Sequence, residues 1–226
     1  MKHLKINLIF AILTSIVTIK TYAYGFEVKN TDGVTIYYKT IENTKNVEVT
    51  YKGSGPYVYK NEYTGKVDIP ESINYNGTTY RVTGIGDNAF QDCSNLTLIN
   101  MPNSITSIGK SAFYGCVGLS EIDIPDAVTS IGGNAFYETG WYKSLPNGII
   151  YFKNWLLGYK GSKPSGNVNI NEGTIRLAGS AFSDCTDITS ITIPNSVISI
   201  SDGAFSGCSG LILINIPNHY CPVKVD

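Results

Sequence analysis

Few side chains in this chain of 226 residues have the types and spacing that catalysis requires. Outside the N-terminal leader described below, the one histidine is His219. A Ser/His/Asp or Cys/His site would need this histidine buried and oriented by a third group, which a terminal turn next to Pro217 is a poor place to provide. Cys221 lies close in sequence, but two ligands fall short of a structural zinc site. We therefore expect a protein that is not an enzyme and that holds no metal and no cofactor.

Two carboxylates, Glu121 and Asp123, form a small acidic spot that could meet a cation or a basic partner. Two carboxylates alone are weak support for a metal site. Both belong to a column of residues that we expect to face outward from a row of strands, and this column is either a binding face or merely solvated. Glu121 and Asp123 are therefore candidate ligand-contact residues.

An aromatic group in the middle of the chain supplies the other candidate ligand-contact residues, which are Trp141, Tyr142, Tyr151 and Trp155. Exposed aromatic rings can stack on sugar rings or anchor a protein partner. The alternative is that these rings only cover the junction between an inserted hairpin and the rest of the protein.

The elements that position these residues follow from a repeat. Phe90, Phe113 and Phe136 are each 23 residues apart, and after one omitted position Phe182 and Phe205 resume the same phase. Cysteine, proline and alanine columns keep this spacing as well. A fixed period of this length predicts a solenoid, whose stacked turns share one core because a single turn cannot bury its apolar face alone.

Each repeat is expected to contain two short strands joined by a corner. In residues 105–127, the alternation of Ile122 and Ile124 predicts a strand with both side chains inward, and the proline that follows ends it. Residues 105–109 predict a shorter strand. Between the two, residues 111–114 indicate a single helical turn whose phenylalanine fills the core.

Four of the five cysteines, Cys93, Cys116, Cys185 and Cys208, occupy one position in successive repeats. This column favours small buried thiols. Disulfides between adjacent turns are the alternative, because the spacing of neighbouring strands overlaps the Cα distances of disulfides.

We divide the chain into a signal peptide (1–23), an N-terminal β-rich cap (24–81), a solenoid (82–219) with a hairpin inserted at about 138–173, and a short C-terminal tail (220–226). The leader has basic residues, an apolar run too short to span a bilayer and small residues up to its end, without a lipoprotein cysteine. We expect an exported protein, secreted or at the cell surface, with no membrane span after cleavage. The chain has 17 basic and 18 acidic side chains, which argues against a nucleic-acid partner.

The sequences IGKSAFYGC at residues 108–116 and IDIP at residues 122–125, repeated every 23 residues, resemble the BspA-type leucine-rich repeats of surface proteins from host-associated bacteria. Residues 147–159 resemble the extra hairpin that members insert between turns. The resemblance covers residues 67–217. It implies a right-handed, β-rich leucine-rich-repeat solenoid and adhesion to host proteins or other cells.

Three functional hypotheses follow from these observations. The first is binding of a protein or glycoprotein, including host extracellular matrix, by an adhesion protein. The second is a structural solenoid that self-associates through its thinly capped C-terminal edge. The third is a glycan-binding module that uses the aromatic residues of the inserted hairpin.

Overall fold

The computed structural model describes residues 25–58 and 60–216. The predicted signal peptide and the C-terminal tail with Cys221 lie outside the described residues, as does His219 at the end of the predicted solenoid. Within the described part of the chain, no helix has the length and apolar character needed to cross a membrane.

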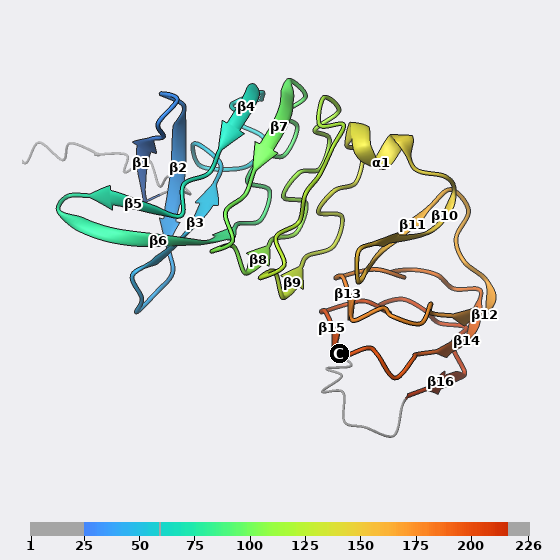
Figure 1. Cartoon of the computed structure of the whole chain (residues 1–226). Helices are drawn as coiled ribbons and strands as arrows, with labels where there is room; N and C mark the ends of the chain where they lie inside the picture. The colour runs from blue at the N-terminus through green and yellow to red at the C-terminus, as the bar shows by residue number, and fades with distance from the viewer. Residues whose placement is uncertain (1–24, 59, 217–226) are drawn as a thin grey trace, which may run out of the picture.

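Short strands make up most of the regular structure, and the described residues contain one short helix (Figure 1). The N-terminal half contains β1 (Phe26–Lys29), β2 (Thr35–Thr40), β3 (Asn46–Thr50), β4 (Gly65–Asp68), β5 (Ser72–Tyr75), β6 (Thr78–Ile85), β7 (Leu96–Asn100), β8 (Ser107–Ile108) and β9 (Ser130–Ile131). Next come α1 (Gly140–Ser144), β10 (Gly148–Phe152), β11 (Trp155–Lys160), β12 (Gly166–Asn169), β13 (Arg176–Leu177), β14 (Ile188–Thr192), β15 (Ser199–Ile200) and β16 (Leu213–Asn215).

Parallel pairing of strands from successive repeats confirms the predicted solenoid. Ile85 of β6 pairs with Ile108 of β8, and Ile108 pairs with Ile131 of β9. In the C-terminal half, Val168 of β12 pairs with Ile191 of β14, as the phase of the repeat predicted. Each of these pairs joins positions one repeat apart, so the 23-residue period is built into the sheet register.

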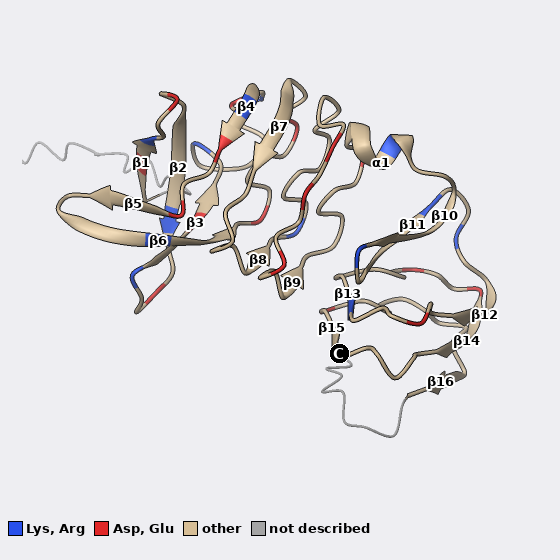
Figure 2. Ribbon diagram, in the orientation of Figure 1, with Lys and Arg blue, Asp and Glu red and all other residues tan. Residues whose placement is uncertain are grey.

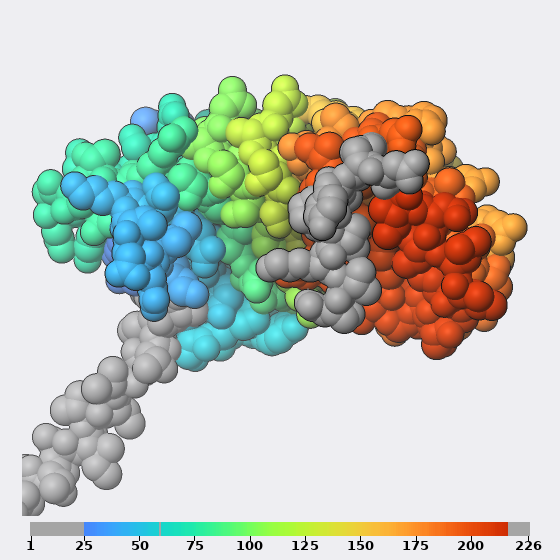
Figure 3. All heavy atoms as spheres, turned by 90° about the horizontal axis from the view of Figure 1, so that it is seen from below, coloured from blue at the N-terminus to red at the C-terminus, as the bar shows by residue number. Residues whose placement is uncertain are grey.

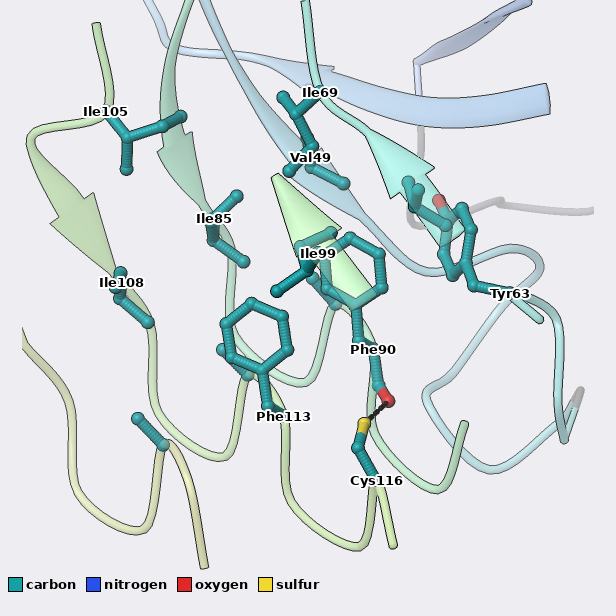
Figure 4. Close-up of a cluster of buried hydrophobic side chains, with 14 of the residues drawn as sticks. Val49, Tyr63, Ile69, Ile85, Phe90, Ile99, Ile105, Ile108, Phe113 and Cys116 are labelled. Atoms are coloured by element: carbon teal, nitrogen blue, oxygen red, sulfur yellow. Dashed lines mark hydrogen bonds between the residues drawn. The ribbon is translucent and has the colours of Figure 1, made fainter. Parts of the chain in front are cut away.

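The core is a stack of aromatic rings flanked by isoleucines (Figure 4). The ring of Phe113 lies 5.1 Å from that of Phe90 and 5.5 Å from that of Phe136, in nearly parallel planes. The Cys116 thiol donates a hydrogen bond to the carbonyl of Phe90 in the preceding turn (3.0 Å). Stacked rings at these distances add to the stability that their burial provides.

The corner that carries each phenylalanine differs from the expected helical turn. In the corner of Phe113, backbone N–H groups donate to carbonyls three residues earlier, as in a helical turn. However, Ser111 and Gly115 adopt positive φ angles of 53° and 73°. Residues in this left-handed region interrupt a helix and turn alternate N–H groups toward the next repeat. The corner therefore bonds to its neighbour in the stack, as a strand does.

The cysteine column consists of free thiols, as expected for small buried core residues, and not of disulfides between adjacent turns. Cys93, Cys116 and Cys185 are buried and Cys208 is partly buried. Burial raises the pKa of Cys93 to about 11 and also raises that of Cys116. Because the thiolate is the reactive form, these cysteines are inert core residues in the folded protein.

At the N-terminal end, β1, β2 and β3 form an antiparallel meander whose last strand pairs in parallel with β6. The ring of Tyr63 is buried and lies 4.6 Å from that of Phe90, where a preceding repeat would place a phenylalanine. β6 runs through the predicted boundary at residue 81, so the two regions share one sheet.

The regular stack of repeats is interrupted between β9 and β13 (Figure 1), and no ring stack joins Phe136 to Phe182 among the described residues. Here α1 is followed by the antiparallel hairpin of β10 and β11, and β11 pairs in parallel with β13. The buried residues fall into two clusters that meet at this hairpin. The direction of stacking turns here, and the two halves lie side by side in one elongated body (Figure 3).

One predicted strand is absent. Ile122 and Ile124 are buried as expected, but residues 119–125 form no strand. The carbonyl of Leu119 accepts the Trp141 N–H (2.8 Å), and the carbonyl of Ile124 accepts the Lys153 ammonium (2.8 Å). Because these carbonyls bond to the helix and the hairpin, they do not pair with a neighbouring strand.

Candidate binding groove at the interrupted repeat

A groove of about 620 Å³ lies at the interruption, between the corner at residues 134–138 and the corner at residues 180–184. We call it the aromatic groove. It is lined by Lys110, Tyr114, Ile131, Gly132, Asn134, Ala135, Phe136, Tyr137, Trp141, Tyr142, Ile150, Leu157, Gly158, Tyr159, Gly161, Lys163, Ser180, Ala181, Ser183 and Asp184.

One wall of the groove is a row of tyrosine rings. The rings of Tyr114 and Tyr137, one repeat apart, stack at 5.7 Å, and the ring of Tyr137 lies 4.9 Å from that of Tyr142. Tyr137 is 39% exposed. Tyrosine presents a large apolar surface with a polar tip and few rotatable bonds, which is why it is enriched at binding surfaces.

Tyr142 is held in place by contacts on several sides. Its hydroxyl donates to the Tyr159 carbonyl (3.1 Å), and its backbone N–H donates to the side chain of Thr139, the N-cap of α1. The ammonium of Lys160 lies 5.8 Å from the ring centre. Burial, with smaller contributions from Tyr137 and other neighbours, raises the pKa of Tyr142 to about 12. The Tyr142 phenol is therefore held in a fixed position in the wall of the groove.

Trp141 lines the groove and also packs against the core. Its ring packs edge-on against Phe136 (6.0 Å) and Phe152 (5.4 Å). Trp141 thereby continues the ring stack where the next phenylalanine is missing.

The other two aromatic candidates do not line the groove. Trp155 is 3% exposed, is packed into the core and has the Arg176 guanidinium 5.7 Å from its ring centre. Tyr151 is half-buried, and its hydroxyl accepts the Asn171 N–H (3.2 Å). The hairpin that carries them is part of the solenoid, because β11 continues its sheet. The structure thus brings Trp141 and Tyr142 together and places Tyr151 and Trp155 elsewhere.

Glu121 and Asp123 are exposed and lie outside the aromatic groove. The ammonium of Lys153, at the hairpin tip, contacts the carboxylates of Asp123 (2.9 Å) and Asp126 (3.6 Å). The hydrogen bond to Asp123 is the largest cause of a raised Lys153 pKa. This acidic spot therefore already holds a cation from the protein itself. Among residues 25–58 and 60–216, no group of three His, Cys, Asp or Glu could hold a metal ion.

A second cavity, of about 610 Å³, runs along the short strands and the glycine- and serine-rich positions that follow them. Its charged residues are of mixed sign, with Lys39 and Lys110 set against Glu48, Asp87 and Asp202. Acidic and basic residues are likewise scattered along the ribbon (Figure 2). No single sign of charge dominates this cavity.

Sequence reasoning missed most of the tyrosine wall. Tyr114 and Tyr137 directly follow the phenylalanines of two successive repeats, and this shared phase was a detectable signal. Tyr159 and Lys163 reach the groove only because β11 passes along it, which the sequence did not indicate.

The family model for the BspA type leucine rich repeat region matches six copies, within residues 54–156, 83–176 and 158–223. The chain belongs to this family of leucine-rich-repeat proteins. Members of this family are typically binding proteins rather than enzymes, and protein–protein interaction is their characteristic activity. They are typically found at the bacterial surface or secreted.

Several solved structures are similar to this chain. A leucine-rich-repeat protein of T. pallidum has 21% identity and a TM-score of 0.45, with 83% of this chain and 82% of that chain covered. A leucine-rich-repeat protein of Bacteroides ovatus has 24% identity and a TM-score of 0.39 over 86% and 54% of the two chains. For a leucine-rich cell-surface protein of Faecalibacterium prausnitzii the values are 19% and 0.32, over 84% and 76%. No curated protein matches the chain.

Proposed function

We propose that this protein is exported, remains at the cell surface or is secreted, and binds a protein or glycoprotein of a host or neighbouring cell through the aromatic groove. The observation that carries the proposal is the tyrosine wall. Exposed and half-exposed tyrosines in a row, fixed by hydrogen bonds and packing, form an ordered apolar surface with polar tips. Such anchors supply much of the binding energy in protein interfaces.

Two further features support this proposal. The family to which the chain belongs consists typically of surface or secreted binding proteins. The basic and apolar leader at residues 1–23 has the layout of a secretory signal peptide. Both agree with a partner outside the cell that makes the protein.

The experiment is binding of the mature chain, residues 24–226, to an array of extracellular-matrix proteins, plasma proteins and mucin glycans. Tyr137→Ala tests the groove, since this residue is exposed enough to be replaced without loss of core packing. Tyr57→Ala is the matched control, because Tyr57 is 68% exposed and lies outside the groove. We expect a saturable interaction that Tyr137→Ala weakens at least about tenfold, as for an interface anchor. Equal binding by both variants would contradict the site.

Self-association is a second candidate function, favoured by apolar residues at the C-terminal end of the described stack. Ile212 is 87% exposed, and Ile198, Leu213 and Ile216 are each about half exposed. Three of them, Ile212, Leu213 and Ile216, are close in sequence, and contiguous exposed apolar patches mark interfaces between proteins. Light scattering of the mature chain at high micromolar concentration tests this candidate, and a strictly monomeric protein would contradict it.

A further inference from the structure

The corners of successive repeats are joined by a regular set of backbone hydrogen bonds. At each of three junctions, alternate N–H groups of one corner donate to carbonyls of the next, at 2.7–3.3 Å. The donors and acceptors are Asn88, Phe90 and Asp92 to Lys110, Ala112 and Tyr114; Ser111, Phe113 and Gly115 to Gly133, Ala135 and Tyr137; and Ser180, Phe182 and Asp184 to Asp202, Ala204 and Ser206.

At the interruption this ladder is open. The equivalent donors are the N–H groups of Asn134, Phe136 and Glu138, and the equivalent acceptors are the carbonyls of Gly179, Ala181 and Ser183. Among the described residues none of these six groups has a backbone partner. The one hydrogen bond to any of them within the described part of the chain is a long one, from the Cys185 thiol to the Ser183 carbonyl (3.9 Å). The aromatic groove separates the two rows.

The gap exists because one repeat lacks its corner. Counted by the 23-residue period, Gly158 and Tyr159 stand where Ala and Phe should be. The chain does not turn there, since β11 continues straight through both residues and pairs with β10. β11 and β12 still pair with strands of the following repeat, so only the corner of this repeat is missing.

The gap is closed at one end and open at the other. At the closed end, the Gly179 N–H donates directly to the Ile131 carbonyl (2.7 Å). Gly133 packs so tightly there that a Cβ would lie 2.6 Å from the Ser180 hydroxyl oxygen. Toward the open end, the ring of Phe136 contacts Trp141 edge-on, and the ring of Phe182 stacks on Phe205. The two rows of backbone groups are thus in contact at the Gly179 end and separated by the groove at the other end.

We propose that the aromatic groove binds an extended segment of the partner polypeptide, which pairs with these two rows as the missing corner would. This inference rests on the proposed function and names the part of the partner that is bound. At the open end, two alternate positions in each row are available, the N–H groups of Phe136 and Glu138 and the carbonyls of Ala181 and Ser183, which correspond to a paired segment of about three residues. Backbone pairing of this kind is the usual way in which a sheet edge captures a peptide.

The groove's surroundings fit a peptide whose backbone, more than its charge, is recognised. Among the described residues, Lys110, Lys163 and Asp184 are the only charged ones that line the groove, and the Lys163 ammonium is already bonded to the Asp184 carbonyl (2.7 Å). The tyrosine wall would cover alternate side chains of the segment and shield its hydrogen bonds from water. Hydrogen bonds shielded in this way are stronger than exposed ones.

The test begins with selection of peptides from a displayed heptapeptide library against the immobilised mature chain. Bound peptides are eluted only by competition with an excess of the same chain in solution. Selected peptides are then synthesised with single N-methyl groups at successive positions. We expect N-methylation at alternate positions to weaken binding about fivefold to tenfold, the effect of one lost hydrogen bond, and the intervening positions to be indifferent. In ¹⁵N spectra, the amides of Phe136 and Glu138 should shift and become protected on binding.

Several outcomes would overturn the inference. One is a library that yields no peptide sensitive to Tyr137→Ala, with Tyr57→Ala as control. Another is a bound peptide indifferent to N-methylation. A third is a groove that takes glycans from the array and not peptides. If the array partner is lost in Tyr137→Ala but its peptides show no alternation, the inference fails and the proposed function stands. If the partner binds Tyr137→Ala normally, the proposed function itself fails.

Discussion

The junction between the corners of Phe113 and Phe136 and the gap between those of Phe136 and Phe182 are built from the same sequence pattern. At the first, three backbone hydrogen bonds and a ring stack join the corners. At the second, both are absent among the described residues, and a groove lined by tyrosines takes their place. The comparison teaches that a repeat can keep its strands, and so the phase of the solenoid, while its corner is replaced by a groove.

The largest expected difference in stability is between removing a ring that stacks on two neighbours and removing a ring that stacks on one. Phe113→Ala should lower the free energy of unfolding by about 3–5 kcal/mol, because the ring is fully buried between two others. Phe205→Ala should cost clearly less, since Phe205 is half-buried and stacks only on Phe182 among the described residues. Urea denaturation of both variants measures this, and equal losses would break the comparison.

Trp155→Ala should also cost about 3–5 kcal/mol, because Trp155 is a core residue of the hairpin. Trp141→Ala, with a half-buried ring, is the matched variant and should cost less. Thermal unfolding is the measurement. A Trp155→Ala protein as stable as the wild type would mean that the hairpin lies off the solenoid rather than within it.

Alkaline pH should lower the stability of the folded protein through ionisation of Tyr142. Its pKa rises from the ordinary 10.0 to about 12 in the folded protein, so between these values the folded state retains a proton that the unfolded state has lost. Its contribution to stability is therefore complete below pH 10 and declines as pH rises toward 12. Tyr142→Phe should show a smaller decline than the wild type in denaturation series from pH 9 to 12.

The control for this titration is Tyr57→Phe, at an exposed position outside the groove. It should follow the wild-type curve. A Tyr142→Phe protein that also follows that curve would show that the Tyr142 phenol is no more protected than an exposed one.

The smallest effect is expected at the hairpin tip. Lys153→Met removes exposed ion pairs to Asp123 and Asp126 and should cost about 0–1 kcal/mol, a difference that 1 M salt should reduce. Urea denaturation at low and high salt measures it. A loss well above this range would mean that the bond from Lys153 to the Ile124 carbonyl holds the strandless segment in place.

The repeat made most of the fold predictable. Residues that recur every 23 positions must face the same way in a stack, so the phenylalanine core, the inward isoleucines and the return of phase at Val168 followed from spacing alone. The corner conformation did not, because its left-handed residues, Ser111 among them, are not confined to glycine. Side-chain identity gives little indication of φ at such positions.

The groove was only partly predictable. Trp141 and Tyr142 were identified as a local aromatic group, and they do line it. Trp155 looked equivalent in sequence, but the pairing of β11 with β13 turns it into the core. The open backbone ladder could not be inferred at all, because it depends on β11 running straight where the period calls for a corner.

The most direct test of the open ladder is amide hydrogen exchange of the unliganded mature chain, read residue by residue by NMR. The amides of Phe90, Phe113 and Phe182 are hydrogen-bonded to the next corner, whereas that of Phe136 has no such partner among the described residues. We predict that the Phe136 amide exchanges at least about 100-fold faster than the other three, as expected for a backbone group outside the hydrogen-bonded core. Equal protection of all four amides would show that the gap is closed, and would contradict both the groove and the peptide site.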